Sequence, residues 1–344
     1  MKSAMHGRIK KERGFLHRAW RRVLNIALFL EIHEIISLLT LLTLTFLYSI
    51  HLNLGTFVET TREITVTAGL ITRTVFLIML LMLGMIVAFP KWRFIGYAQL
   101  VFRIMTSFLI MLLSYEIVMR YIQLMGHTMY DHLLQKWDSF LFFGKQPAEW
   151  MDKLNTLPMT SLLSGAYLAW FPFCYGTIFL LLIKSRRAAL EYATVALTSF
   201  YIGNIGYVLV PAVGPLFTHE FSTVVGGLTA KMLDPGFYKP VANCFPSLHT
   251  CISVVMLVQV WKYFRKMIWV YTPVTALIVF STVYLRIHYA VDVFVGVVLA
   301  ILTTICIPVI MTLWERLREQ KARSQFTMIP IEINDNSIGR QREA

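Results

Sequence analysis

Charged residues are scarce in this chain of 344 residues: Asp, Glu, Lys and Arg make up 15%, against about 25% in soluble globular proteins. Cysteine is also scarce, with four residues, which excludes a small disulfide-rich scaffold. Polar low-complexity runs are missing, which excludes a disordered chain. The abundant residues are apolar, at 57%, and the mean hydropathy is +0.62. This composition excludes a soluble enzyme with one buried core and favours a membrane protein.

Long apolar segments recur along the chain. A bilayer core about 30 Å thick needs about 20 mostly apolar residues per helix. Eight segments meet this description: Ile35–Leu52, Thr74–Phe89, Gly96–Ile117, Ser161–Ile183, Ala188–Val210, Thr250–Phe264, Ile268–Leu285 and Val291–Leu313. We therefore predict an all-α, polytopic integral membrane helix bundle with about eight transmembrane helices. No short apolar run with a cleavage site follows Met1, so the basic N-terminus is interpreted as a retained segment.

The net charge of +13 is compatible with nucleic acid, anionic lipid or membrane topology as its cause. Its distribution favours topology. The N-terminal segment, every second loop and the C-terminal tail together hold 22 of the 32 basic residues, whereas the alternate loops hold seven basic and eight acidic residues. Since cytoplasmic loops are rich in Lys and Arg, both termini are predicted to be cytoplasmic. We expect no nucleic-acid partner.

The predicted spans divide the chain into four parts. These are a basic cytoplasmic N-terminal segment (1–34), three N-terminal transmembrane helices (35–122), a catalytic membrane core (123–314) and a polar cytoplasmic tail (315–344). The compact loops and the lack of an evident sorting signal favour a bacterial inner (plasma) membrane. One outer loop contains Trp137–Gly144, an apolar and aromatic stretch beside a few charges. It is either an interfacial helix or a loop that covers the helix ends.

The first motif with chemical potential is Cys244-Phe245-Pro246-Ser247-Leu248-His249, which leads into the sixth predicted span. Ser247 is placed to cap that helix. The free N–H groups and the positive end of the helix dipole would then form an anion site. His249 would stand beside the bound anion as a proton donor. The alternative is a structural histidine near the membrane interface.

The second motif is Arg286-Ile287-His288-Tyr289-Ala290-Val291-Asp292, at the entrance to the eighth predicted span. His288 and Asp292 are four residues apart, so on a helix they share one face. A carboxylate near an imidazole N–H fixes its tautomer and makes the other ring nitrogen a better nucleophile or base. By the topology above, both motifs lie at the outer face, the periplasmic or lumenal side.

Pro246-Ser247-Leu248-His249, followed by Ser281-Thr282 and by His288-Tyr289-Ala290-Val291-Asp292, resembles the type 2 phosphatidic acid phosphatase superfamily. The Ser-Leu-His and His-Tyr-x-x-Asp variants, with Asp138-Ser139-Phe140-Leu141-Phe142-Phe143-Gly144 before them, look more like its inositol phosphorylceramide synthase branch. The resemblance covers roughly Trp137 to Thr312.

The resemblance implies roles for four residues. His288 would be the nucleophile that forms a phosphohistidine, and Asp292 the carboxylate that orients it. His249 would be the general acid for the departing alcohol, and Ser247 a phosphate contact. The superfamily uses no metal or other cofactor for this chemistry, so none is expected.

The chain departs from the superfamily in its phosphate-binding cations. The family's first motif, a Lys followed by Arg-Pro, has no clean match, and Pro211–Pro215 occupies its place. Phosphoryl transfer needs positive charge around the equatorial oxygens. We predict Arg286 as the substitute, because Arg grips phosphate in a bidentate manner, with Lys239 as a second candidate. The alternative is that Arg286 extends to lipid headgroups.

Two hypotheses follow. The first is a membrane-embedded enzyme that acts on a phospholipid or lipid phosphate from the outer leaflet. With water as acceptor it is a lipid phosphatase, and with a lipid hydroxyl it is a headgroup phosphotransferase. The second is a non-enzymatic transporter or scaffold with structural histidines. No inverted repeat or interrupted pair of spans favours the transporter.

Overall fold

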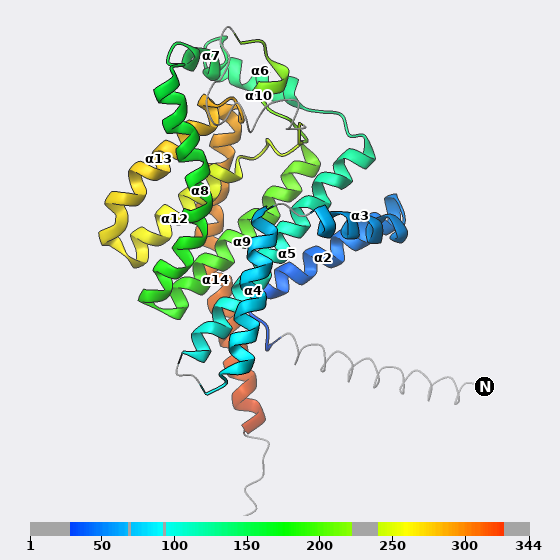
Figure 1. Ribbon diagram of the computed structural model, residues 1–344, viewed down its shortest axis with the longest axis vertical. Coiled ribbons are helices and arrows are strands. Elements are labelled where there is room, and N and C mark those ends of the chain that lie inside the picture. Colours follow the sequence, from blue (N-terminus) through cyan, green and yellow to red (C-terminus); the bar gives the residue numbers. More distant parts are fainter. Residues whose placement is uncertain (1–27, 68–69, 92–93, 222–239, 327–344) are drawn as a thin grey trace, which may run out of the picture. The chain divides into compact units, whose positions relative to one another are not determined.

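The computed structural model describes residues 28–67, 70–91, 94–221 and 240–326, and within these ranges the chain is all-helical. A 3₁₀ turn, Arg265–Met267, precedes α13. The α-helices, shown in Figure 1, are α2 (Ile32–His51), α3 (Leu54–Thr67), α4 (Leu70–Ala88), α5 (Ile95–Met125), α6 (Asp131–Leu141), α7 (Pro147–Asp152), α8 (Leu157–Lys184), α9 (Arg186–Leu209), α10 (Pro215–Thr218), α12 (Leu248–Tyr263), α13 (Ile268–Tyr284) and α14 (Ala290–Phe326).

Several helices are long and apolar enough to cross a membrane, which makes the chain an integral membrane protein. Five qualify by length and composition among the described residues: Ile32–His51, Ile95–Met125, Leu157–Lys184, Arg265–Tyr284 and Ala290–Lys321. A shorter apolar helix covers Arg73–Ala88. The total of eight spans and the cytoplasmic position of the termini stay predictions. The helices α9 and α12 lie outside the group of five, since α12 has 16 residues and α9 carries polar residues such as Thr194, Thr198 and Asn204 among its apolar ones.

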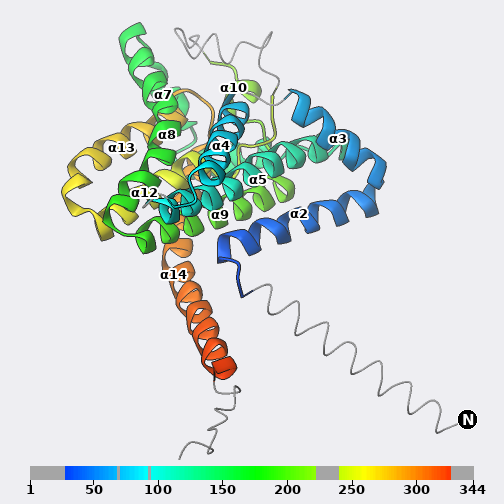
Figure 2. The same cartoon turned by 60° about the horizontal axis from the view of Figure 1, so that its bottom comes forward.

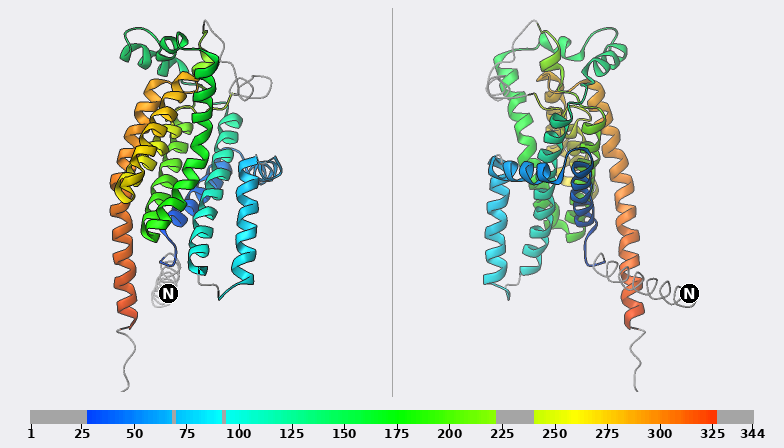
Figure 3. Two further views of the ribbon diagram at one scale, coloured as in Figure 1. Left: turned by 60° about the vertical axis from the view of Figure 1, so that its left-hand side comes forward. Right: turned by 90° about the vertical axis from the view of Figure 1, so that its right-hand side faces the viewer.

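Residues Leu30–Pro308 form one compact unit, and Val309 onward belongs to a second unit. In the compact unit, α9 contacts α2, α5, α8 and α12, while α13 packs against α8 and α12. These helices lie side by side in Figures 1 and 3. Small residues permit this, because Ala188, Ala189, Ala193 and Ala196 are fully buried on α9.

Buried charge on α9 is paired at the end where the helix begins. The Glu191 carboxylate, on a residue only 2% exposed, accepts hydrogen bonds from Lys262 Nζ and from the Tyr263 hydroxyl, both at 2.6 Å. Polar groups inside a membrane bundle need such partners. This network ties α9 to the end of α12.

The short helices α6, α7 and α10 lie together at one end of the compact unit (Figures 1 and 3). The helix predicted within Trp137–Gly144 begins earlier, at Asp131, and ends at Leu141. The chain then turns through Gly144, which has φ +84°, a value that glycine adopts without steric cost. On α6, Trp137 and Phe140 are exposed and Asp138 is buried. The helix is therefore amphipathic, with its acidic side turned inward.

Candidate active site

Three loops meet at the end of the bundle that carries both histidine motifs. In the loop after α9, the Ala212 carbonyl accepts a hydrogen bond from the Cys244 N–H, at 3.0 Å. The Ser247 N–H donates to the Asp292 carbonyl at 3.1 Å, which joins the starts of α12 and α14. Gly214, with φ +95°, allows the closest approach, because a Cβ there would lie 2.4 Å from the Ile287 carbonyl oxygen. The loops therefore hold one another in register.

His288 lies just before α14 and is only 3% exposed. Its backbone N–H and that of Ile287 both donate to the Thr282 carbonyl, at 3.1 Å each. Its ring Nδ1 lies 2.8 Å from the Cys244 carbonyl oxygen and 3.5 Å from Asp292 Oδ2. Both oxygens accept hydrogen bonds, so Nδ1 carries the ring proton. The lone pair is then on Nε2.

The structure brings Asp292 to His288 as the sequence predicts, but with a different geometry. His288 is not on the helix that carries Asp292, because α14 begins at Ala290. The nearest partner of Nδ1 is the Cys244 carbonyl, and the carboxylate lies farther away. Asp292 Oδ2 accepts the Tyr289 N–H at 2.9 Å. The carboxylate therefore fixes the turn as well as facing the ring.

Cys244, the first residue of the motif that contains His249, is buried against Asp292. The residue is 1% exposed, and its thiol donates to Asp292 Oδ2 at 2.8 Å. Burial raises the pKa of the Cys244 thiol well above its usual range, and the Asp292 charge raises it further. The thiol thus stays protonated as a donor. The ligand atoms of Cys244, His288 and Asp292 lie within 4.8 Å of one another, a set that the thiol–carboxylate hydrogen bond already holds together.

His249 is held in an aromatic box at the start of α12. Its ring stacks on Tyr167, with centroids 4.3 Å apart, and lies 4.6 Å from Trp170. Its Nε2 is buried and has no hydrogen-bond partner among the described residues. The rings of His249 and His288 lie 6.2 Å apart. Two histidines with unused ring nitrogens therefore face one small region.

Ser247 caps α12 as predicted, because its Oγ accepts the Thr250 N–H at 3.3 Å. Its own hydroxyl proton goes to Thr250 Oγ1, at 3.0 Å. The first N–H groups of an α-helix have no acceptor within the helix. The start of α12 thus directs backbone donors and the positive end of its dipole toward the region beside His249.

Of the two predicted phosphate-binding cations, Arg286 lies within the described residues and Lys239 does not. Arg286 is buried, its guanidinium pairs with Asp152, and it lies over the Phe221 ring at 4.0 Å. Burial lowers the pKa of Arg286, and the Asp152 charge raises it. A phosphate would have to share this cation with Asp152. Lys239 lies outside the described residues.

Two aspartates of α6 hold the loops that carry the histidine motifs, and sequence reasoning assigned them no role. Asp138 accepts the N–H groups of Ala290 and Val291, both at 2.8 Å. Asp131 accepts the Gly214 N–H at 2.8 Å and the Tyr289 hydroxyl at 3.0 Å. The spacing of Asp131 and Asp138 could have indicated this role. Residues seven positions apart lie on one face of a helix, and here that face is opposite Trp137 and Phe140.

The environment of Asp138 is nonpolar enough to change its titration. Burial raises the pKa of Asp138 to about 6, and the Asp292 charge raises it too, whereas the N–H groups of Ala290 and Val291 lower it. Both carboxylate oxygens are occupied by these N–H donors. The start of α14, which carries Asp292, is thus held by a carboxylate that titrates just below neutral pH.

Comparison with known proteins gave one match. A family model described as the PAP2 superfamily matches residues 132–306, just over half of the chain. This range contains both histidine motifs and the segment from α6 to the middle of α14. No curated protein and no solved structure matches the chain.

Proposed function

The chain belongs to the PAP2 superfamily, and from this premise we propose that it is a membrane-embedded lipid phosphate phosphatase or headgroup phosphotransferase. One observation carries the proposal. His288 Nδ1 faces the Cys244 carbonyl and Asp292, which leaves Nε2 as the nucleophilic nitrogen, while the unpartnered Nε2 of His249 is nearby. A nucleophile oriented through its other nitrogen and a separate proton donor are the two groups that this chemistry requires.

In the first step, His288 Nε2 attacks phosphorus in line with the departing alcohol. The N–P bond forms as the P–O bond breaks, and His249 gives its proton to the alcohol oxygen. The charge of a bound phosphate favours the protonated form of His249 beside it. The N–H groups at the start of α12, with Arg286, would stabilise the equatorial oxygens. The product of this step is a phosphohistidine.

In the second step, an acceptor oxygen attacks the phosphohistidine. The acceptor gives its proton to His249, the new O–P bond forms and the N–P bond to His288 breaks. With water the product of a monoester is inorganic phosphate. With a lipid hydroxyl, the phosphoryl or phosphodiester group passes to a second lipid. The resemblance places Leu248 where the superfamily's commoner motif has Gly, and Thr282 where it has Arg. These two differences favour the synthase branch, and hence transfer.

The predicted topology sets the side on which the reaction occurs. The histidine motifs follow loops with little net positive charge, so the site would face the periplasm or a lumen. The lipid would enter from the adjacent leaflet, between helices. A bacterial inner membrane remains the expected location. No metal or other cofactor enters the two steps.

The proposal is tested with purified protein in detergent and a panel of labelled lipid phosphates, with and without ceramide and diacylglycerol as acceptors. We expect release of phosphate or transfer of label to a lipid hydroxyl. The acceptor that takes the label distinguishes phosphatase from transferase. Absence of both activities over the whole panel would contradict the proposal and favour the transporter or scaffold.

The role of His249 predicts a dependence on the leaving group. His249→Gln removes the proton that a lipid alcohol needs to depart, so turnover of a lipid phosphate should fall roughly 10²- to 10⁴-fold. The aryloxide group of an aryl phosphate departs without a proton. With this substrate, the loss of rate in the first step should therefore be much smaller. The measurement is the burst of aryl alcohol release by both proteins. Equal losses for both substrates would argue against a general acid.

The predicted phosphate contact of Arg286 gives a second test. Asp152→Asn removes the charge that now pairs with Arg286, so the guanidinium should be freer to bind an oxyanion. Vanadate, which mimics the five-coordinate phosphorus, should inhibit this variant at a severalfold lower concentration, because the cation no longer shares a carboxylate. Arg286→Gln should raise that concentration. If neither variant changes inhibition by vanadate, Arg286 is not a phosphate ligand.

A further inference from the structure

The helices α6 and α7, with the turn between them and the residue that follows, form a cap of residues 131–153 at one end of the compact unit (Figure 1). In the sequence this α6–α7 cap is almost neutral, because it holds four acidic residues and three lysines. The acidic residues are Asp131, Asp138, Glu149 and Asp152, and the lysines are Lys136, Lys145 and Lys153. The fold separates the two signs of charge.

All four acidic side chains of the α6–α7 cap are engaged within the protein. The carboxylates of Asp131 and Asp138 accept backbone N–H groups of the loops that carry the histidine motifs. Asp152 pairs with the buried Arg286. The Glu149 carboxylate lies 3.2 Å from an imidazole nitrogen of the loop after α9. The negative charge of the α6–α7 cap is therefore compensated inside the protein.

The three lysines of the α6–α7 cap are exposed. Among the described residues, no ion pair joins any of them to a carboxylate. Lys136 is on α6, Lys145 follows the turn at Gly144, and Lys153 comes directly after α7, so the positive charge extends along the whole cap. A surface on which exposed charge of one sign gathers attracts partners of the opposite sign.

Exposed aromatic side chains accompany these lysines. On α6, Trp137 and Phe140 are exposed, Phe140 by 78%, and their rings lie 6.3 Å apart. Lys136 precedes Phe140 by four residues, so the two share one face of the helix. Phe143 in the turn is 93% exposed, although its φ of +57° is unfavourable for a bulky residue. Aromatic rings beside lysines are typical of surfaces that lie in the headgroup region of a bilayer.

The adjoining helix brings the α6–α7 cap to the level of the headgroups. The helix α8, which is long and apolar enough to cross a membrane, has 28 residues, or about 42 Å. A bilayer with its headgroup regions is about 40–45 Å thick, so α8 begins near one headgroup region. Five residue steps lead from Asp152, the end of α7, to Leu157, the start of α8 (Figures 1 and 2). These steps span at most about 18 Å, so the cap lies within reach of the headgroups.

We propose that the exposed face of the α6–α7 cap binds anionic phospholipid headgroups of the surrounding bilayer, in the leaflet on the side of the histidine motifs. The lysines pair with the lipid phosphates, and the aromatic rings lie between the uppermost parts of the acyl chains. A second copy of the chain would bring the same lysines against this face, and like charges oppose that contact. These lipids are structural partners and not substrates, so the inference does not depend on the proposed function. The face consists of Lys136, Trp137, Phe140, Phe143, Lys145 and Lys153.

The test uses full-length protein in nanodiscs of neutral phosphatidylcholine, with a fluorescent bimane group attached to Phe140→Cys. The background is Cys306→Ser, because the other three cysteines are buried. A fraction of the lipid, either phosphatidylglycerol or phosphatidylcholine, carries a nitroxide quencher near the top of an acyl chain. The nitroxide phosphatidylglycerol should quench bimane at position 140 at a mole fraction at least about fivefold lower than the nitroxide phosphatidylcholine, because each lysine near the surface contributes about that factor.

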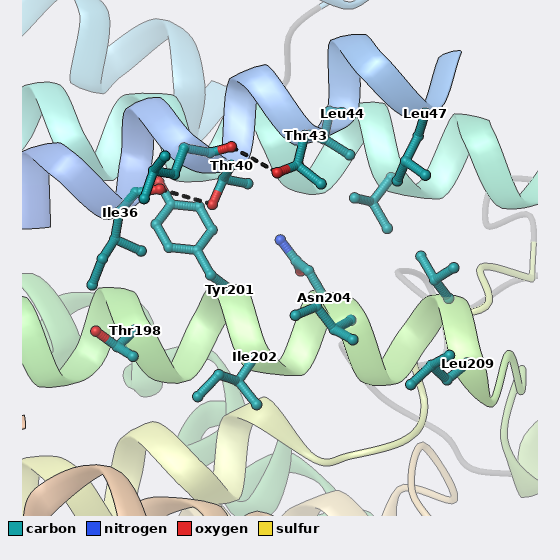
Figure 4. A pocket seen from close by; sticks show the side chains of 14 residues that line it. Ile36, Thr40, Thr43, Leu44, Leu47, Thr198, Tyr201, Ile202, Asn204 and Leu209 are labelled. Carbon is teal, nitrogen blue, oxygen red and sulfur yellow. Dashed lines mark hydrogen bonds between the residues drawn. The ribbon is translucent and has the colours of Figure 1, made fainter. Parts of the chain in front are cut away.

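A bimane group at Leu209 provides the matched control. Leu209 is 67% exposed at the end of α9 that leads to the histidine site, and it lines a groove between α2 and α9 (Figure 4). The residues that line this groove are uncharged. Bimane on Leu209→Cys should therefore be quenched by the two nitroxide lipids equally.

Charge variants test the lysines themselves. Lys136→Gln, Lys145→Gln and Lys153→Gln together should remove the preference for phosphatidylglycerol at position 140, while quenching at position 209 stays the same. Lys91→Gln with Lys266→Gln removes two exposed lysines from loops at the opposite ends of the helices, and this pair should leave the preference intact.

Three results would overturn the proposal. Equal quenching by the two lipids at position 140, with all cap lysines present, would mean that the cap does not recognise anionic lipid. Absence of quenching at position 140, with quenching at position 209 retained, would mean that the cap does not contact the bilayer. If a water-soluble quencher loses access to position 140 in detergent as the protein concentration rises, a second copy covers this face, and the lipid proposal is wrong.

Discussion

Replacing His288 with alanine should abolish phosphate release or transfer, with a fall in turnover of at least about 10⁴-fold, because no other group can form the covalent intermediate. His288 is buried, and its Nδ1 is held by the Cys244 carbonyl. No other described nucleophile is oriented in this way toward His249. The measurement is single-turnover release of labelled phosphate from a lipid phosphate by purified protein.

A matched control separates catalysis from folding. His132→Ala removes an exposed histidine of α6 and should leave turnover and membrane insertion unchanged. In the unaltered protein, rapid quenching after addition of labelled substrate should trap an acid-labile, base-stable label on His288. Full activity of His288→Ala with normal insertion would exclude the phosphohistidine mechanism. A label on another residue would reassign the nucleophile.

Asp138→Asn should lower turnover roughly 10- to 100-fold, although Asp138 touches no substrate in the proposed mechanism. Its two oxygens hold the N–H groups of Ala290 and Val291, and an amide would place its own N–H₂ against one of them. The start of α14 would shift, and with it Asp292. A displacement of about 1 Å in a catalytic group costs about this much. Glu59→Gln, at an exposed carboxylate of α3, is the control and should be silent.

The pH dependence distinguishes this positioning role from a general loss of structure. Asp138 has a pKa of about 6, above the ordinary 3.8, so it takes up a proton as the pH falls through about 6. The protonated carboxyl can no longer accept both N–H groups. Activity should therefore fall as the pH drops below about 6, which forms the acid limb of the pH–activity profile. In Asp138→Asn this part of the limb should be missing, because the variant has already lost one acceptor.

The effect of the same group on stability has the opposite sign. A raised pKa means that the folded protein binds the proton more tightly than the unfolded chain does. Asp138 therefore contributes stability that is present below pH 3.8 and is lost as the pH rises through about 6. Thermal unfolding followed with pH should show that Asp138→Asn removes this contribution. If activity falls below about pH 6 in Asp138→Asn as it does in the unaltered protein, Asp138 is not the cause of that fall.

The helical segments and the start of α12 could be predicted from the sequence because their causes are local. Apolar runs of bilayer length give helices wherever they occur, and Ser247 caps α12 through a residue three positions away. The bounds of α6 were harder to predict. This helix includes Asp131–Gln135, where few residues are apolar. The carboxylates of Asp131 and Asp138 accept hydrogen bonds from backbone N–H groups that are distant in the sequence, and these bonds fix the helix.

What the sequence by itself determined is that this is a helical membrane protein with two histidine motifs of the PAP2 type, since composition and short motifs are carried by neighbouring residues. Only the tertiary structure decided how those motifs are supported. The Cys244 carbonyl is 44 positions from His288, and Asp138 is 152 positions from Ala290. Contacts over such separations arise from helix packing and loop closure, which no local pattern encodes. The pairing of Arg286 with Asp152 depends on that packing for the same reason.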